Sequence, residues 1–181
     1  MYIPISENGI KDYSEGFVVK FFKSDNTEWV ANFQVGWTDF NYVHTFDKSE
    51  FIIIVAGGTC YIMNPEDHKP KSAFGVGFKS ILEKDNGGIV LEDNTNIIII
   101  EPNGEFWQSE QISFDGLAEL KFENNIIYGL SYDPTSKFDL WTEFTLNLNT
   151  KEIIGGSYNK IFGNKKKIKV TSKKRYWWKI W

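Results

Sequence analysis

The sequence contains few of the residues that most often carry out chemistry. It has one cysteine, Cys60, and two histidines, His44 and His68, among 181 residues. A single cysteine excludes an intrachain disulfide, and this set cannot build the usual zinc site without carboxylate ligands. Cys60 lies between apolar neighbours, which predicts a buried and inert thiol. His44 shares a strand face with Tyr42 and Phe46, which predicts a partly buried histidine.

Long apolar segments are also absent. The longest, residues 51–56, is far shorter than the ~20 residues of a membrane-spanning helix. Residues 1–16 have neither a basic start nor an apolar run, so we expect no signal peptide. Together with the single cysteine, these features predict a cytoplasmic protein.

Catalytic signatures are missing as well. There is no G-x-S-x-G motif, no glycine-rich loop before a helix and no calcium-loop pattern. The consecutive Glu66, Asp67 and His68 are typical of a solvated loop. The 24 acidic residues could supply a catalytic pair, but nothing distinguishes one pair from the others. We therefore expect no catalytic residue, cofactor or metal, and keep a hydrolase as the third hypothesis.

Alternation of apolar and polar residues is the main pattern that is present, and it is typical of strands with one buried face. It occurs in residues 29–37, 125–132 and 143–149. The predicted buried positions are Trp29, Ala31, Phe33, Val35 and Trp37 in the first segment, Ile126, Tyr128, Leu130 and Tyr132 in the second, and Phe144, Leu146 and Leu148 in the third.

Two segments, 51–56 and 97–100, are apolar on both sides. Both faces of such strands must be covered, which indicates stacked sheets. Turns are predicted between the strands at Asn86-Gly87, Asp93-Asn94, Asn103-Gly104, Asn124-Asn125 and Asn149-Thr150, with an exposed loop at Pro65–Pro70. The only helical turn we expect is a short one near Ser80–Asp85.

A weak internal repeat is visible. Residues 57–65 resemble residues 93–102, and a related strand follows at 141–150. Repeats near 40 residues are typical of four-stranded propeller blades, while a two-sheet sandwich or an irregular meander would also fit. The prediction is thus an all-β domain of residues 1–164, with antiparallel strands in stacked sheets.

Four short motifs lie between residues 115 and 158: DGLAEL at 115–120, GLSYDP at 129–134, WTEFTLNLNT at 141–150 and GGSY at 155–158. The pattern resembles a group of uncharacterised bacterial β-rich proteins. The resemblance implies a bacterial source and, for some members, a place beside toxin and immunity genes. The motif residues also fit turns and core positions without any further role. They are Asp115, Gly116, Asp133, Pro134, Trp141, Phe144, Gly155, Gly156 and Tyr158.

Charge divides the chain into two unequal parts. Of its 20 basic residues, eight lie in residues 165–181, which hold no acidic residue, so residues 1–164 keep 12 basic against 24 acidic. The C-terminal segment, residues 165–181, also carries three tryptophans. Its candidate contact residues are Lys165, Lys166, Lys167, Lys169, Lys173, Lys174, Arg175, Trp177, Trp178 and Trp181. A charged partner is expected, or mutual neutralisation of the two parts.

The C-terminal segment has three interpretations. It could pack on the acidic body as a final strand and aromatic anchor. It could contact an anionic membrane surface through lysine and tryptophan. Binding of nucleic acid is the least favoured, because the acidic body repels phosphate and no nucleic-acid motif is present.

The leading functional hypothesis is a non-catalytic binding protein, an immunity protein that neutralises a basic toxin through its acidic surface. Complementary charge accelerates such association. The toxin itself is implied only by the resemblance. The alternative is a peripheral membrane protein that is recruited by the C-terminal segment.

Overall fold

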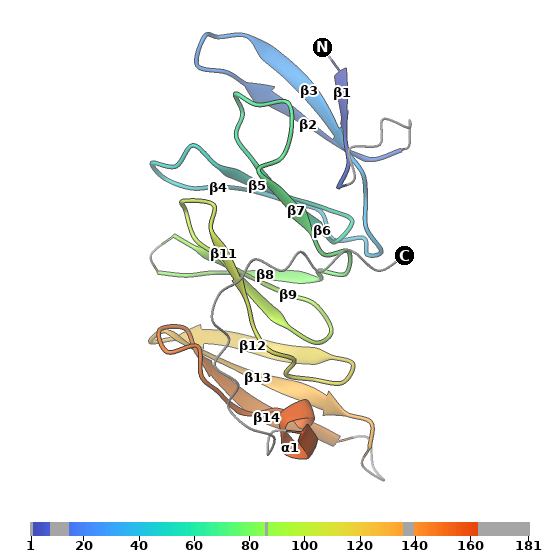
Figure 1. The fold of residues 1–181 in the computed structure, drawn as a ribbon, viewed down its shortest axis with the longest axis vertical. Coiled ribbons are helices and arrows are strands. Elements are labelled where there is room, and N and C mark those ends of the chain that lie inside the picture. Colours follow the sequence, from blue (N-terminus) through green and yellow to red (C-terminus); the bar gives the residue numbers. More distant parts are fainter. Residues whose placement is uncertain (1, 8–14, 86, 136–139, 163–181) are drawn as a thin grey trace.

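The computed structural model describes residues 2–7, 15–85, 87–135 and 140–162. Four β-sheets are stacked along the long axis in the order of the sequence (Figure 1), and we name them sheets A to D. Sheet A contains β1 (Tyr2–Ile5), β2 (Phe17–Phe22) and β3 (Glu28–Phe33). Sheet B contains β4 (Tyr42–Thr45), β5 (Ile52–Ala56), β6 (Thr59–Met63) and β7 (Ser72–Phe74). Sheet C contains β8 (Ser80–Glu83), β9 (Ile89–Glu92), β10 (Ile97–Ile100) and β11 (Phe106–Gln108). Sheet D contains β12 (Leu117–Glu123), β13 (Ile126–Asp133), β14 (Leu140–Asn147) and β15 (Ile153–Gly155), followed by helix α1 (Ser157–Phe162).

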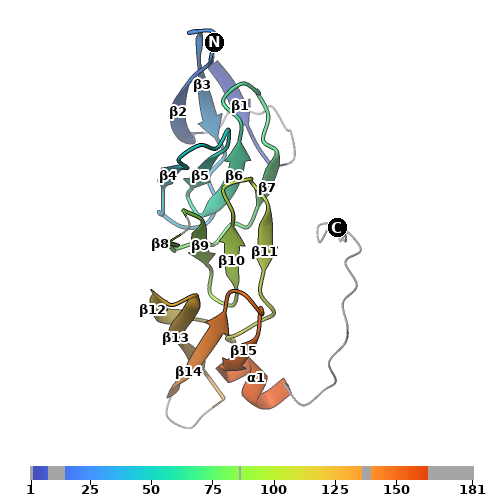
Figure 2. The same cartoon turned by 90° about the vertical axis from the view of Figure 1, so that its left-hand side faces the viewer.

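Sheets B, C and D are simple antiparallel meanders in which each strand pairs with the next one along the chain. Sheet A differs, because β1 pairs in parallel with β3. In Figure 2 the first strands β4, β8 and β12 lie along one side of the stack, and the last strands β7, β11 and β15 lie along the other. The prediction of an all-β fold with stacked antiparallel sheets is confirmed, and the four described sheets form an open stack.

Three hydrophobic cores separate the four sheets. The A/B core contains Trp29, Phe33, Ile54 and Tyr61. The B/C core contains Ile53, Cys60, Leu91 and Ile98. The C/D core contains Val90, Ile99, Ile127 and Phe144. Sheets B and C therefore contribute to two cores each, and successive residues of one strand enter different cores, as Ile53 and Ile54 do.

The two segments that are apolar on both sides are central strands, as predicted. They form β5 and β10, the second and third strands of sheets B and C. Ile53 and Ile54 are fully buried on opposite faces of sheet B, and all four residues of β10 are buried. The internal repeat is also structural, since its three members contain β6, β10 and β14, each the third strand of its sheet.

The predicted turns all connect neighbouring strands. The backbone of Asn124 and Asn125 has φ of 49° and 61°, and Gly104 has φ of 72°. A left-handed pair such as Asn124-Asn125 matches the twist of a two-residue hairpin. The predicted helical turn at Ser80–Asp85 is wrong: this segment forms β8 and pairs with β9. The one described helix, α1, begins in the GGSY motif, which we had interpreted only as a bend.

The prediction that Val35 and Trp37 continue the buried face of β3 is also wrong. The strand ends at Phe33, and the exposed fractions are 44% for Val35 and 86% for Trp37. Here the chain crosses from sheet A to sheet B, and the Gly36 amide donates to the Ala56 carbonyl of β5 at 3.0 Å. The backbone no longer follows the pleat of sheet A, so the alternation of residues does not correspond to burial.

Strand β13 has the predicted alternation, but the apolar face is the outer one. Ile127, Ser131 and Asp133 are buried, whereas Tyr128 is 40% exposed. Gly129 explains the inversion, because a Cβ atom there would lie 2.7 Å from the Phe144 ring of β14. Small residues on the inner face of β13 thus leave room for large side chains of β12 and β14.

Candidate binding groove

A hollow of about 660 Å³ opens between the edge strands β4 and β8, on the side of the stack where the first strands lie (Figure 2). Its lining is made of Tyr42, Val43, His44, Thr45, Phe46, Asp47, Glu83, Asp85, Gly87 and Pro102. Strand β4, the loop after it and the β8–β9 hairpin therefore form the walls. The floor is the margin of the B/C core, which contains Phe46 and Tyr42.

Three rings of a four-ring ladder, those of Tyr42, His44 and Phe46, line one wall of the hollow. Phe40, Tyr42, His44 and Phe46 alternate along β4 and its flanks, so they project from the same face of sheet B. Ring centroids are 6.1 Å apart for Phe40 and Tyr42, 6.4 Å for Tyr42 and His44, and 4.7 Å for His44 and Phe46. The ladder gives the hollow a rigid aromatic wall.

Glu83 connects this wall to sheet C. Its Oε1 lies 3.6 Å from His44 Nδ1 and accepts a hydrogen bond from the Tyr42 hydroxyl at 3.4 Å. The His44 side chain is only 12% exposed, while that of Glu83 is 63% exposed. The predicted partly buried histidine is confirmed, and its partner carboxylate still presents most of its surface to water.

A second hollow of about 310 Å³ adjoins the first and shares Thr45 and Phe46 with it. It contains Glu50, whose Oε2 accepts from the Asn64 amide at 2.9 Å, and Glu66, whose Oε1 accepts from the Ser24 backbone amide at 2.7 Å. We call the two hollows together the acidic groove.

The acidic groove has a strongly one-sided charge. Five carboxylates line it, from Asp47, Glu83 and Asp85 in one hollow and Glu50 and Glu66 in the other. No lysine or arginine is among the lining residues of these two hollows, although the loop between β4 and β5 also carries Lys48. Low-dielectric walls concentrate such a field, so the groove attracts cations.

Sequence reasoning found only one wall of the groove. It singled out His44 with Tyr42 and Phe46, because they follow one another on a strand. It missed Glu83 and Asp85, which come from the next sheet, about 40 positions later in the chain. The repeat at 36 residues was the only signal that could have placed β8 beside β4.

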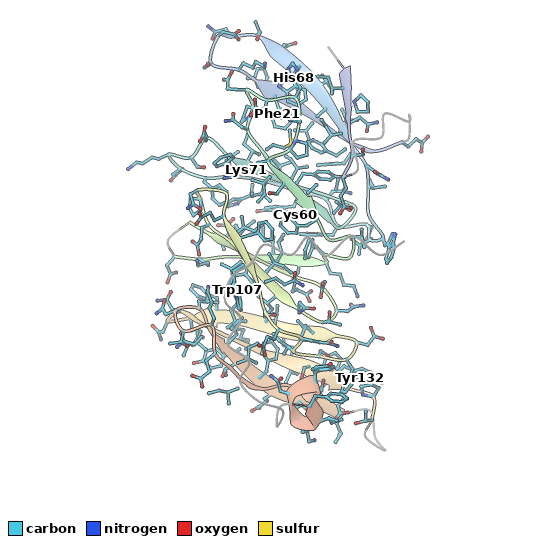
Figure 3. All side chains as sticks on the ribbon, viewed as in Figure 1. Phe21, Cys60, His68, Lys71, Trp107 and Tyr132 are labelled. Atoms are coloured by element: carbon cyan, nitrogen blue, oxygen red, sulfur yellow. The ribbon has the colours of Figure 1, made fainter. Side chains whose placement is uncertain are left out.

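The Glu66, Asp67 and His68 loop is a cap rather than a metal site. His68 stacks edge-on against Trp29 with ring centroids 4.8 Å apart, and Figure 3 shows it at the sheet A end of the stack. The Trp29 indole donates to the Pro65 carbonyl at 2.9 Å. Within the described ranges, no group of three or more His, Cys, Asp or Glu side chains could hold a metal ion.

Cys60 and Glu92 are two of the buried titratable groups that lie outside the groove. Cys60 is fully buried in the B/C core (Figure 3), and burial raises the pKa of its thiol, which agrees with an inert cysteine. Glu92 of β9 is 7% exposed, and desolvation raises its pKa to about 7. Its Oε1 accepts from the Ser80 hydroxyl at 3.2 Å.

The motif residues meet at one corner of sheet D, where they support the structure. Gly155 and Gly156 have φ of 80° and 88° and turn the chain into α1. The Ser157 amide then donates to Ser131 Oγ at 2.8 Å, and its hydroxyl donates to the Tyr132 carbonyl at 2.6 Å. The Tyr158 amide donates to the Ile112 carbonyl at 3.1 Å. These bonds fix α1 to the end of β13.

Asp133 and Pro134 form the turn after β13, as predicted. Asp133 is 2% exposed, and its Oδ1 accepts from the Thr135 hydroxyl at 2.6 Å and the Thr135 amide at 3.0 Å. The Thr135 hydroxyl is the main reason that the pKa of Asp133 is lowered, and Lys160 of α1 adds to the effect from 3.8 Å. The carboxylate thus organises a turn and a helix contact.

The remaining motif residues divide between core and surface. Phe144 is 2% exposed, which confirms the prediction, but Trp141 is 48% exposed on the outer face, so the prediction that it packs inward is wrong. It lies against Tyr132, with ring centroids 5.5 Å apart. Gly116 lies beneath this pair, and Asp115 accepts from the Asn94 amide at 3.3 Å.

All ten candidate contact residues of the C-terminal segment lie outside the described residues. In the described part of the chain, no helix has the length and apolar character that crossing a bilayer would require. No family model matches the chain, and no curated protein is similar to it in sequence.

Proposed function

We propose that the chain is a non-catalytic binding protein that holds a basic segment of another protein in the acidic groove. The observation that carries this proposal is the set of five carboxylates, from Asp47 to Asp85, that line the two adjoining hollows of the acidic groove without a lining lysine or arginine. Complementary charge accelerates encounter and selects the partner.

The form of the groove also suits a polypeptide partner. It runs across two sheets and has an aromatic ladder along one wall, and aromatic side chains contribute most to protein interfaces. An arginine side chain can stack on such rings while it pairs with Glu83 or Asp85. A basic, arginine-rich segment therefore fits both surfaces at once.

A more specific role, as an immunity protein, follows from the motif resemblance together with this groove. Toxins that attack nucleic acid are often basic, because they must bind phosphate. A protein that covers such a surface with carboxylates would block it. On this proposal the partner is a basic toxin, and the gene that encodes it lies next to the gene for this chain.

The experiment measures binding of the purified product of the adjacent gene to three full-length forms of the protein. Glu83→Gln with Asp85→Asn removes two charges from the groove. Asp39→Asn with Glu110→Gln removes the same two charges from exposed positions outside the lining residues. We expect the groove pair to weaken binding by about tenfold or more and to flatten its salt dependence, while the control pair changes it less than about twofold.

Two results would contradict the proposal. Equal losses for the groove pair and the control pair would mean that only the net charge matters and that the groove is not the site. If the neighbouring product neither binds the parent protein nor is neutralised by it in cells, the immunity role is refuted.

A further inference from the structure

The outer face of sheet D is an apolar surface at the end of the stack. The register places Tyr128 opposite Thr145 and Thr145 opposite Ile154, so these side chains share a face. Leu130 pairs with Glu143, and Tyr132 with Trp141, on the same face. The helix α1 is held through Ser131 and Asp133, which belong to the opposite, inner face of β13. Its apolar residues are Ile126, Tyr128, Leu130, Tyr132, Trp141 and Ile154.

Three of these residues are well exposed, whereas Ile126, Leu130 and Tyr132 are half-buried. The exposed fractions are 40% for Tyr128, 48% for Trp141 and 65% for Ile154. Monomeric proteins rarely leave a continuous apolar patch of this kind without a partner. The opposite end of the stack also exposes apolar side chains, Val18 at 54% and Phe22 at 68%, but there Lys20 pairs with Glu28 at 2.6 Å and lies over the Phe22 ring.

We infer that the outer face of sheet D is the docking surface for the chain's own C-terminal segment, residues 165–181. Three features favour this occupant over the others. The first is position: α1 is bonded to the end of β13, so the chain leaves Phe162 beside this sheet. Tyr132, at that end of the face, is labelled in Figure 3.

The second feature is length. Fifteen positions separate Phe162 from Trp177, which spans up to about 50 Å when extended. Four strands that are about 4.8 Å apart make a sheet only about 15 Å wide. The tryptophans can therefore reach every part of the face.

The third feature is complementary chemistry. The outer face carries two carboxylates, Glu123 and Glu143, and one lysine, Lys121. Glu119 and Glu152 are also exposed, on or beside the edge strands of sheet D. The C-terminal segment brings eight cations together with Trp177, Trp178 and Trp181. A second copy of the same face would instead place carboxylate against carboxylate, which costs free energy.

The test uses an engineered thiol as a probe, because Cys60 is fully buried. Ile154→Cys places one reactive cysteine on the outer face of sheet D. Alkylation of this cysteine is timed in the full-length chain and in a full-length chain that also carries Trp177→Ser, Trp178→Ser and Trp181→Ser. Ile154 lies outside the buried cores, so circular dichroism should show both forms folded.

We expect alkylation to be about tenfold or more slower with the tryptophans in place, which corresponds to a covered state favoured by 1.4 kcal/mol. Salt at 1 M, where the screening length is about 3 Å, should remove part of the protection. Two control sites are Val18→Cys on the outer face of sheet A and Thr45→Cys in the acidic groove, and both should react equally fast in the two forms.

Four results would overturn the inference. Equal rates at Ile154→Cys would mean that the tryptophans do not cover the face. Protection at Thr45→Cys would place the segment in the acidic groove instead. Protection that rises with protein concentration would mean that a second molecule supplies the cover. If Ile154→Cys stays unprotected and the tryptophan variant loses binding to anionic vesicles, the C-terminal segment binds a membrane surface and does not cover sheet D.

Discussion

The middle and the ends of the stack use isoleucine in opposite ways. Ile98 of β10 in sheet C is 2% exposed, whereas Ile154 of β15 in sheet D is 65% exposed. Sheets B and C are covered on both faces, so almost every residue of β5, β6, β9 and β10 is buried, whichever face of the sheet its side chain is on. Sheets A and D have one covered face each. Stability is therefore concentrated in the middle, and the outer faces of sheets A and D lie outside the three cores.

The largest effect should come from truncating a middle isoleucine. Ile98→Ala removes three carbon atoms from the B/C core and should lower the free energy of unfolding by about 3 kcal/mol. Val18→Ala, on the outer face of sheet A and 54% exposed, is the control at the end of the stack and should change it by less than about 0.5 kcal/mol. Urea denaturation followed by tryptophan fluorescence measures both. Similar losses would show that the outer face of sheet A is as well packed as the middle.

A second contrast concerns two glycines with similar backbones. Gly58 has φ of 87° in the β5–β6 turn, where an added Cβ would lie 2.5 Å from Thr38 Oγ1 and 2.9 Å from the Val76 carbonyl. Gly87 has φ of 82° in the β8–β9 turn, with nothing within 4 Å of that position.

Alanine at Gly58 should therefore cost about 2–3 kcal/mol, from backbone strain and steric overlap together. Alanine at Gly87 should cost only the strain, about 1 kcal/mol. Thermal melts of the two variants separate these contributions. If the two losses were equal, the crowding around the β5–β6 turn would have no energetic weight.

The third prediction concerns a buried carboxyl in the middle of the stack. Desolvation raises the pKa of Glu92 to about 7 in the folded state, against about 4.3 in an unfolded chain. Below pH 4 both states hold the proton. Between the unfolded pKa and the folded pKa, the unfolded chain has already released the proton while the folded protein still holds it. The free energy of unfolding therefore falls as the pH rises through this range, and it levels off above pH 7.

Glu92→Gln should remove that decline and should be more stable than the parent at pH 8 by about 2 kcal/mol, because partial access of water screens the full effect. Denaturation at a series of pH values from 4 to 8 measures the slope. The control Glu105→Gln changes an exposed carboxylate and should leave the slope intact. An unchanged slope in the Glu92 variant would assign the pH dependence to another group.

The smallest effect is expected at the sheet A end. Lys20→Met breaks the pair with Glu28, in which both side chains are about half exposed. Exposed ion pairs contribute about 0.5 kcal/mol or less, and salt screens them. Denaturation at low and high salt should show a small loss that disappears at 1 M. A loss above about 1.5 kcal/mol would indicate that this end is more tightly organised than its exposure suggests.

Local pattern was enough to predict the strands and most turns of this chain. β5 and β10 were identified as central strands because both of their faces are apolar, and the Asn103-Gly104 turn followed from its need for positive φ. These features depend only on neighbours in the sequence. The helix α1 was missed, because at six residues it is too short to show a periodic stripe.

Tertiary context decided what the pattern could not. Alternation in β13 correctly grouped Tyr128 with Leu130, but which face is covered depends on Gly129 and on the ring of Phe144 in the next strand. The acidic groove depends on β4 lying beside β8, and the packing of one sheet on another cannot be predicted from the residues of either strand alone. The chain's charge asymmetry predicts a charged partner or mutual neutralisation of its two parts, but it does not say where the carboxylates lie.

The open stack has a consequence for how the molecule loses structure. Among the described residues, each hydrophobic core joins a sheet only to the sheet before or after it in the chain, so the cooperative unit is effectively one-dimensional. Detaching sheet D breaks one interface, whereas opening sheet B breaks two. Amide hydrogen exchange should therefore form a gradient, slowest in β5 and β10 and fastest toward the termini, and a partner bound across sheets B and C would steepen it by holding these two sheets together.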